Sequence, residues 1–310
     1  MKLPVIPLAQ TVIKLCELKG IKHIVISPGS RSAPLAIGFT GHSYFKCYSI
    51  VDERSAAFFA LGIAQQLQEP VAIVCTSGSA LLNYYPAIAE AYYSNIPLVV
   101  LSADRPKHLI NVGDGQTINQ KNVFVNHILY SANLKLDVKD EKNIPFTEEL
   151  PIIKSLEDKF ERFFKIQQDI QAYNEEEINN ALNMARSRKG PVHINIPLEE
   201  PLYQTTDQFN VDPKLIEART LVKDMDAFVL RECIEIWMNS QKKMILVGES
   251  KPNTLQQQWL DELAHDNSVI VFTETTSNLH HSEFFPSIDK IIAIDTKKTF
   301  YGLKRSELFL

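Results

Sequence analysis

The stretch HIVISPGSRSAPL (residues 23–35) joins a short apolar run to a loop of serine, proline, glycine and arginine. A continuous apolar run of this length, ended by turn residues, is typical of a strand buried on both faces. Two later stretches repeat the arrangement, VAIVCTSGS (residues 71–79) and LVVLSADRP (residues 98–106). Helical patterns lie before and between these strands, at residues 8–18, 53–68 and 79–94. This alternation predicts an α/β fold, a parallel sheet with helices on both faces.

The same alternation continues to the end of the chain. Residues 174–188 predict a helix with a polar face, and residues 192–196 predict the last strand of the first domain. Residues 201–213 lack periodicity and indicate a linker. A second unit follows, with predicted helices at 226–238 and 255–265 and predicted strands at 244–247, 269–272 and 291–294. We expect a first domain over 1–200, a linker over 201–220 and a small or incomplete α/β domain over 221–310.

Composition narrows the class of protein. The chain has 310 residues, a net charge of -5 and interspersed acids and bases, which argues against a nucleic-acid surface. The four cysteines form no C-x-x-C pair, and this usage favours a reducing compartment. No segment reaches the ~20 apolar residues of a membrane span, and no signal peptide is recognisable. We therefore expect a cytoplasmic protein.

Polar loops follow the three apolar strands. In an open parallel sheet, ligands bind beyond the carboxyl ends of the strands. The residues expected to lie together there are Ser30, Arg31, Thr76, Ser77, Gly78 and Arg105. Glycines permit close backbone approach, and the N-termini of the following helices favour anions. Each loop taken alone also has the composition of an ordinary turn. Together the loops indicate a site for an anionic ligand.

Glu53 follows Asp52 at the start of a predicted helix. Acidic residues are favoured there by the helix dipole, which is reason enough for their presence. The functional alternative is a buried carboxylate that protonates a nitrogen of a ligand. The apolar sequence AAFFALGIA behind it would keep such a site dry and raise the pKa of the carboxyl group. No G-x-G-x-x-G follows a strand, which disfavours a nicotinamide-dependent oxidoreductase.

Several blocks of this sequence occur together, and in order, in one family. The chain resembles the N-terminal part of 2-succinyl-5-enolpyruvyl-6-hydroxy-3-cyclohexene-1-carboxylate synthase, a thiamine-diphosphate enzyme of menaquinone biosynthesis. The matching blocks are PGSRSAPL (28–35), DERSAAFFALGIA (52–64), TSGSALLNYYPAIAEA (76–91), LSADRP (101–106), GQTINQ (115–120) and GPVHINIPLEEPLY (190–203). The resemblance implies a pyrimidine-binding domain followed by a central α/β domain.

The resemblance also implies roles for individual residues. Glu53 matches the glutamate that hydrogen-bonds the aminopyrimidine ring of thiamine diphosphate and takes part in its activation. The other cofactor-binding positions are Pro28, Gly29, Thr76 and Gly78, and the substrate-binding positions are Ser30, Arg31, Arg105 and Gln116. The implied reaction decarboxylates 2-oxoglutarate and adds the succinyl carbanion equivalent to isochorismate. Both substrates are carboxylates, and guanidinium groups suit carboxylates.

One part of the family pattern is not matched. The family binds the cofactor's diphosphate through Mg²⁺ with a GDG…N motif in a third domain. Gly113-Asp114-Gly115 stands inside the block around GQTINQ rather than after a buried strand, so it is not that motif. We expect no metal ligands in this chain, the Mg²⁺ ligands lying in the absent diphosphate-binding domain.

The family also implies assembly, because its active sites form between subunits; we expect a homodimer or homotetramer. Two alternatives remain for the chain itself. It could be the pyrimidine-binding subunit of a split thiamine-diphosphate 2-oxo-acid decarboxylase. It could also be a truncated, non-catalytic paralogue that acts as an interaction module.

Overall fold

The computed structural model describes residues 1–137, 156–218 and 225–287. The chain divides into two compact units, Met1–Thr220 and Leu221–Leu310. Within the described ranges, no helix combines the length and the apolar character needed to cross a membrane. The four cysteines, Cys16, Cys47, Cys75 and Cys233, are free thiols.

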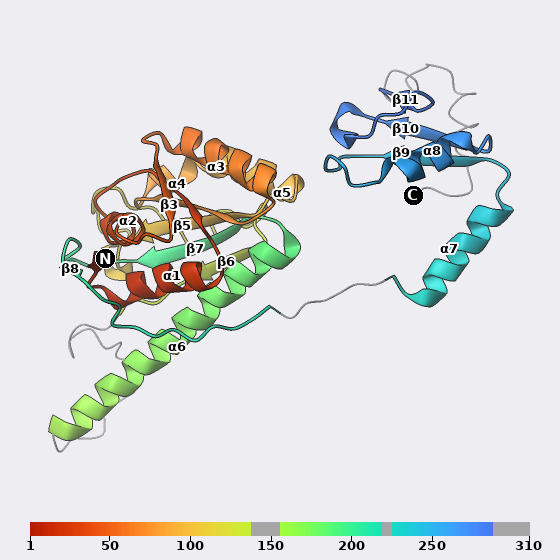
Figure 1. Cartoon of the computed structure of the whole chain (residues 1–310). Coiled ribbons are helices and arrows are strands. Elements are labelled where there is room, and N and C mark those ends of the chain that lie inside the picture. Colours follow the sequence, from red (N-terminus) through yellow and green to blue (C-terminus); the bar gives the residue numbers. More distant parts are fainter. Residues whose placement is uncertain (138–155, 219–224, 288–310) are drawn as a thin grey trace. The chain divides into compact units, whose positions relative to one another are not determined.

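A six-stranded sheet forms the centre of the first unit (Figure 1). Its strand order is β3-β2-β4-β5-β7-β6, and every neighbouring pair is parallel. The strands are β2 (His23–Ile26), β3 (Lys46–Ser49), β4 (Val71–Cys75), β5 (Leu98–Asp104), β6 (Tyr130–Asn133) and β7 (Val192–Pro197). The predicted parallel sheet is confirmed, although β6 was not predicted, because YSAN is too short and polar to show a period.

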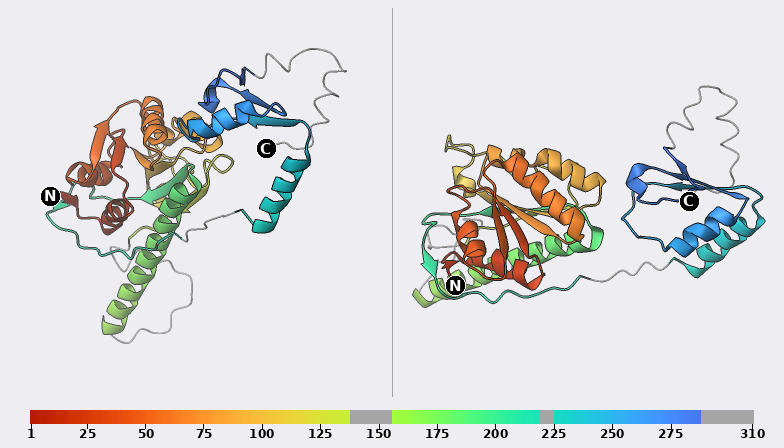
Figure 2. Two further views of the ribbon diagram at one scale, coloured as in Figure 1. Left: turned by 45° about the vertical axis from the view of Figure 1, so that its right-hand side comes forward. Right: turned by 45° about the horizontal axis from the view of Figure 1, so that its top comes forward.

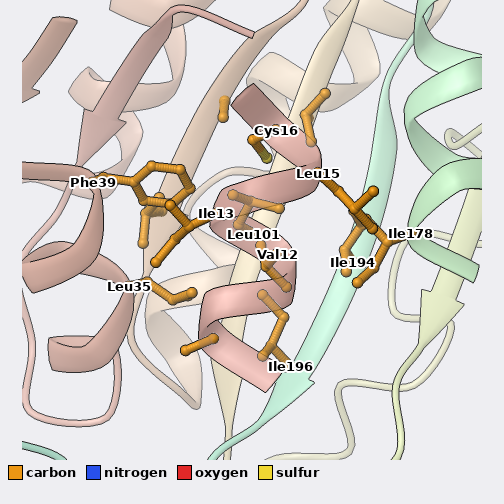
Figure 3. Close-up of a cluster of buried hydrophobic side chains, with 14 of the residues drawn as sticks. Val12, Ile13, Leu15, Cys16, Leu35, Phe39, Leu101, Ile178, Ile194 and Ile196 are labelled. Atoms are coloured by element: carbon orange, nitrogen blue, oxygen red, sulfur yellow. The ribbon is translucent and has the colours of Figure 1, made fainter. Parts of the chain in front are cut away.

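Helices cover both faces of this sheet, as Figures 1 and 2 show. One face carries α1 (Pro7–Leu18), α2 (Ala33–Thr40) and α6 (Leu156–Arg188), and the other carries α3 (Glu53–Leu67), α4 (Ser79–Leu82) and α5 (Tyr85–Tyr93). A short 3-10 helix, η1 (Lys107–Leu109), follows β5. Figure 3 shows how Val12 and Leu15 of α1 meet Leu101, Ile194 and neighbouring side chains. Buried side chains thus cover both faces of the sheet in the part of the chain that the structure describes.

Two predicted helices differ from the observed ones, and one further helix was not predicted. The stretch 79–94 forms two helices instead of one, α4 and α5, with Pro86 in the first turn of α5. The predicted helix 174–188 is the last part of the 33-residue α6. The helix α2 was not predicted, because eight residues as uniformly apolar as APLAIGFT show no amphipathic period.

The segment after β7 packs against the first unit. The strand β8 (Thr205–Thr206) pairs antiparallel with β1 (Leu3–Pro4). Farther on, the carboxamide of Asn179 bonds to the backbones of Lys214 and Ile216. Backbone pairing of this kind leaves no hydrophobic period, which is why the sequence alone suggests a linker here.

The second unit has a three-stranded parallel sheet in the order β11-β10-β9. Its strands are β9 (Lys243–Val247), β10 (Val269–Thr273) and β11 (Phe285–Pro286), and its helices are α7 (Ala227–Asn239), α8 (Gln257–His265) and the 3-10 helix η3 (Thr275–Ser277). Its core is small, centred on Leu260, Val271, Leu279 and Phe284. The strand predicted at 291–294 lies outside the described residues.

Candidate functional site

The ends of β2, β4 and β5 bring the predicted polar loops together. These three strands are neighbours in the sheet, with Ile26 beside Val74 and Cys75 beside Ser102. The loops that follow therefore begin at the same edge of the sheet. A Cβ atom added to Gly29 would lie 2.4 Å from the Cβ of Thr76, so the first two loops are in direct contact. Only glycine fits at position 29 without displacing its neighbour.

Gly78 joins the second loop to the segment around Gln116. Its φ of +84° is a left-handed conformation, and an added Cβ would lie 2.6 Å from the carbonyl oxygen of Gln116. Gln116 itself has a φ of 55°. Both the conformation and the close backbone approach require glycine at this position.

We call Arg31, Ser77, Arg105 and Gln116 the arginine corner. The Nη1 atom of Arg105 donates to the Ser77 hydroxyl at 2.5 Å and lies 3.5 Å from the carbonyl oxygen of Gln116. Its Nε atom forms an ion pair with Asp114. The buried Arg31 donates through Nη1 to the carbonyl oxygen of Leu198 at 2.9 Å. Both guanidinium groups are thus held in place by the protein.

Charges of both signs meet at this corner, because the carboxylates of Glu200, Asp114 and Asp104 act on Arg31 as well as the positive charge of Arg105. Burial lowers the pKa of Arg31, and the nearby positive charge of Arg105 lowers it further. The carboxylate of Glu200 lies 3.6 Å from Arg31, but its side chain is 74% exposed. Two cations held close together in a partly dry site attract a carboxylate or phosphate more strongly than either does alone.

Pro28 and Ser30 lie on the exposed outer side of the first loop, with Gly29 between them. The carbonyl oxygen of Ser30 accepts a hydrogen bond from the Ala33 amide, and the Ser32 hydroxyl donates to the carbonyl oxygen of Gly29. The loop is therefore shaped by its own hydrogen bonds, which leave the Ser30 side chain at the surface.

Glu53 begins α3, next to the arginine corner along the sheet. Asp52 caps this helix by accepting a hydrogen bond from the Ser55 amide at 2.8 Å. The Ser27 hydroxyl donates to the carbonyl oxygen of Ile50, which ties the first loop to the turn before Glu53. The negative charge of Glu53 also reaches the end of β4: it adds to the raised pKa of Cys75, whose main cause is burial.

The environment of Glu53 differs from the expected one. The functional alternative was a buried carboxylate kept dry by AAFFALGIA, but Glu53 is partly exposed in this chain. The alanines of α3 face the sheet, whereas Phe58 and Phe59 are 45% and 44% exposed. The apolar residues of α3 therefore do not enclose the carboxylate, because its two large side chains point outward.

Sequence reasoning missed a group of buried polar residues beneath the loops. Ser102, Asp104, Gln120, His193 and Asn195 are all buried, and hydrogen bonds connect them. A signal was present, because Ser102 and Asn195 are polar residues inside otherwise apolar strands. Among the residues that the structure describes, no group of three or more His, Cys, Asp or Glu side chains has the arrangement of a metal site.

Comparison with known proteins shows the family of this chain. Residues 6–123 match the family model described as "Thiamine pyrophosphate enzyme, N-terminal TPP binding domain". The chain is 53% identical over 314 residues to 2-succinyl-5-enolpyruvyl-6-hydroxy-3-cyclohexene-1-carboxylate synthase of Christiangramia forsetii, an alignment that covers 100% of this chain and 50% of that protein. It is 52% identical over 300 residues to the synthase of the same name from Flavobacterium psychrophilum, covering 96% and 48%.

A more distant relative has the same name. The synthase of Desulfotalea psychrophila is 42% identical over 270 residues, which cover 85% of this chain and 44% of that protein. The chain thus spans about half the length of the relatives that it matches. By these matches it belongs to the 2-succinyl-5-enolpyruvyl-6-hydroxy-3-cyclohexene-1-carboxylate synthase family of thiamine pyrophosphate enzymes, whose N-terminal part it represents.

Proposed function

We propose that this chain forms the pyrimidine-binding half of the active site of a thiamine-diphosphate-dependent synthase that joins 2-oxoglutarate to isochorismate in menaquinone biosynthesis. Its matched relatives have the name of that synthase. The observation that carries the proposal is the meeting of Gly29, Gly78 and the two arginines at neighbouring strand ends, beside Glu53. We assign residues 1–200 to the pyrimidine-binding domain and 221–310 to a central domain.

The residues at the strand ends fit the cofactor's pyrimidine ring. Gly29 and Gly78 lack side chains where two loops meet, so backbone atoms can approach a flat ring. Glu53 would be the carboxylate that hydrogen-bonds the ring nitrogen and holds its proton, with Pro28 and Thr76 beside the ring. When bound, the cofactor supplies an electron sink for loss of carbon dioxide from a 2-oxo acid. The ligands of its Mg²⁺ belong to a domain beyond this chain.

The arginine corner fits the substrates. Both 2-oxoglutarate and isochorismate carry carboxylates, which planar guanidinium groups bind through paired hydrogen bonds. In this proposal Arg31 and Arg105 bind and orient these carboxylates, while Ser30 and Gln116 add hydrogen bonds. The ion pair of Arg105 with Asp114 keeps the side chain in position before a substrate arrives.

A second copy of the chain would cover the exposed surface of α3 near Glu53. Phe58 and Phe59 expose apolar surface on α3, the helix that Glu53 begins. We propose that α3 of another subunit covers this surface in a homodimer or homotetramer. Glu53 would then be enclosed at the subunit interface, where water is excluded.

A chimaera tests the catalytic assignment. This chain would replace the matched part of the Christiangramia forsetii synthase, with which it aligns over its whole length. Glu53→Gln should reduce kcat by about 10²-fold or more, because it removes a carboxylate from proton transfer. Glu69→Gln, at an exposed position just beyond the C-terminal end of the same helix, is the control and should leave kcat unchanged. A Glu53→Gln chimaera with full activity would overturn the proposal.

A titration tests the half-site. Thiamine diphosphate with Mg²⁺ would be added to the 310-residue chain and to its Glu53→Gln variant, and heat would be measured. We expect no tight binding, because the charge-assisted diphosphate contacts lie outside this chain. Micromolar, Mg²⁺-dependent binding that Glu53→Gln weakens would show a complete site, and it would contradict the assignment of half a site.

A further inference from the structure

Gln120 lies beneath the strand-end loops and connects two of them. It is fully buried, although it belongs to a loop between β5 and β6. Both atoms of its carboxamide form hydrogen bonds, one as acceptor and the other as donor. A buried side chain with every polar atom in use fixes the positions of its partners, because each alternative position leaves a polar group unpaired.

The acceptor side of Gln120 holds Gly78. The Gly78 amide donates to Oε1 of Gln120 at 2.8 Å, in a part of the structure where both residues are buried. Gly78 also contacts the backbone of Gln116, four residues before Gln120. The loop of residues 116–120 is therefore attached to the turn between β4 and α4 at two points.

The donor side of Gln120 leads to Arg105. Its Nε2 atom donates to Oδ1 of Asn195 at 2.8 Å and lies 3.2 Å from the carbonyl oxygen of Ala103. Asn195 then donates through Nδ2 to Oδ2 of Asp104 at 2.8 Å. The other oxygen of Asp104 accepts the amide hydrogen of Arg105 at 2.8 Å. A continuous chain of hydrogen bonds thus runs from Gly78 through Gln120, Asn195 and Asp104 to Arg105.

The direction of this chain is fixed at both amides. Turning the carboxamide of Gln120 around would place its NH₂ group against the Gly78 amide and its oxygen against Oδ1 of Asn195. Turning Asn195 would place its oxygen against the carboxylate of Asp104 and its NH₂ group against Nε2 of Gln120. Each change leaves two donors or two acceptors facing each other in a buried site.

We propose that Gln120 is a positioning residue that couples the turn at Gly78 to the substrate-binding arginine Arg105. The proposal rests on the proposed function, in which Gly78 lies at the cofactor and Arg105 at a substrate carboxylate. Gln120 itself touches neither ligand, since it is fully buried, and it acts through the two loops that it joins.

Two substitutions at Gln120 distinguish its hydrogen bond with Gly78 from its hydrogen bond with Asn195. Gln120→Met keeps the length of the side chain and removes both hydrogen bonds, whereas Gln120→Glu keeps the acceptor for Gly78 and loses the donor to Asn195. Gln10→Met is the matched control. Gln10 is equally buried and also bridges backbone groups, donating to the carbonyl oxygen of Pro4 and accepting from the Asn210 amide, but it lies away from the strand-end loops.

The first measurement is amide hydrogen exchange in the whole chain, which needs no ligand. Gln120→Met should speed exchange at Gly78 by about tenfold, because the amide loses its buried acceptor, while Gln120→Glu and Gln10→Met leave it near the original rate. An unchanged exchange rate in Gln120→Met would overturn the inference. Thermal unfolding of each variant shows that the comparison is made on folded protein.

The second measurement uses the chimaera. Both Gln120 variants should raise KM for 2-oxoglutarate by about tenfold, because the Asn195–Asp104 path to Arg105 is broken in each. Gln10→Met should not change KM. An equal rise in KM for Gln10→Met would show a general loss of stability and would refute the positioning role. If Gly78 exchange responds but the unsubstituted chimaera is inactive, the proposed function fails while the coupling of the two loops stands.

Discussion

In the first unit, the arginine corner lies beside the N-terminal turn of α3 at Glu53, but the two regions differ in how far the chain encloses them. Arg31 and Arg105 each have partners within the chain, Leu198 for the first and Ser77 and Asp114 for the second. Glu53 is partly exposed, and the phenylalanines of its helix point outward. The guanidinium groups are thus held by partners within the chain, whereas the Glu53 carboxylate is left partly open to solvent.

The largest expected effect comes from a substitution at Gly78, which lies close to Gln116 of the arginine corner. Gly78→Ala places a side chain against the Gln116 carbonyl oxygen in a left-handed conformation, and we expect a loss of about 3 kcal/mol of unfolding free energy. Gly62→Ala is the control, because position 62 is inside α3 with nothing near an added Cβ; it should stabilise by up to about 1 kcal/mol. Denaturant unfolding measures both. Equal stabilities would contradict the close approach at Gly78.

The buried layer beneath the arginine corner should make the first unit sensitive to acid. Burial lowers the pKa of His193 to about 3 from an ordinary value near 6.5. Below pH 6.5 this histidine is therefore protonated in the unfolded chain but stays neutral in the folded chain. The unfolding free energy is highest above pH 6.5 and falls as the pH decreases. At pH 5 the loss is about 2 kcal/mol. His193→Gln should flatten this dependence in unfolding measured from pH 7 to pH 5; an unchanged slope would assign it to other groups.

Binding of a dicarboxylate tests the arginine corner separately from Glu53, because we expect the ligand to bind at the two arginines. At about ten times its dissociation constant, 2-oxoglutarate should raise the unfolding free energy of the chain by about 1.4 kcal/mol. Arg31→Met should reduce this gain, because one of the two cations is lost. Arg188→Met, at the exposed end of α6, should not change it. The gain is read as the difference in unfolding with and without ligand, and equal gains in all three proteins would refute the assignment.

The smallest effect on stability is expected for the exposed phenylalanines of α3. Phe58→Lys should change the unfolding free energy by less than about 0.5 kcal/mol, because the side chain is already half exposed. The same change should convert a dimer to monomers in sedimentation. Val125→Lys, an exposed apolar position outside α3, should not do so. An assembly that survives Phe58→Lys would place the subunit contact elsewhere.

The parts of the site that the sequence predicted are those fixed by local patterns. The strands before Arg31, Thr76 and Arg105 are continuous apolar runs, and parallel strands must end at one edge, so the meeting of the loops followed from periodicity. The exposure of Glu53 did not follow, because a helix pattern does not say whether apolar residues such as Phe58 face the core or a partner. Gln120 was missed for a related reason: its partners Gly78 and Asn195 are 42 and 75 residues away.

The pairing of β1 with β8 has a consequence for synthesis on the ribosome. Leu3 and Pro4 pair with Thr206 and Thr205, so the first strand of the chain has no partner until some two hundred later residues have been made. At 5–20 residues per second this interval is roughly 10–40 s. During that time the sheet and α1 can assemble, while the opening segment waits. The order of translation therefore makes this antiparallel pair a late closure of the first unit, followed only by later contacts such as those of Lys214 and Ile216 with Asn179.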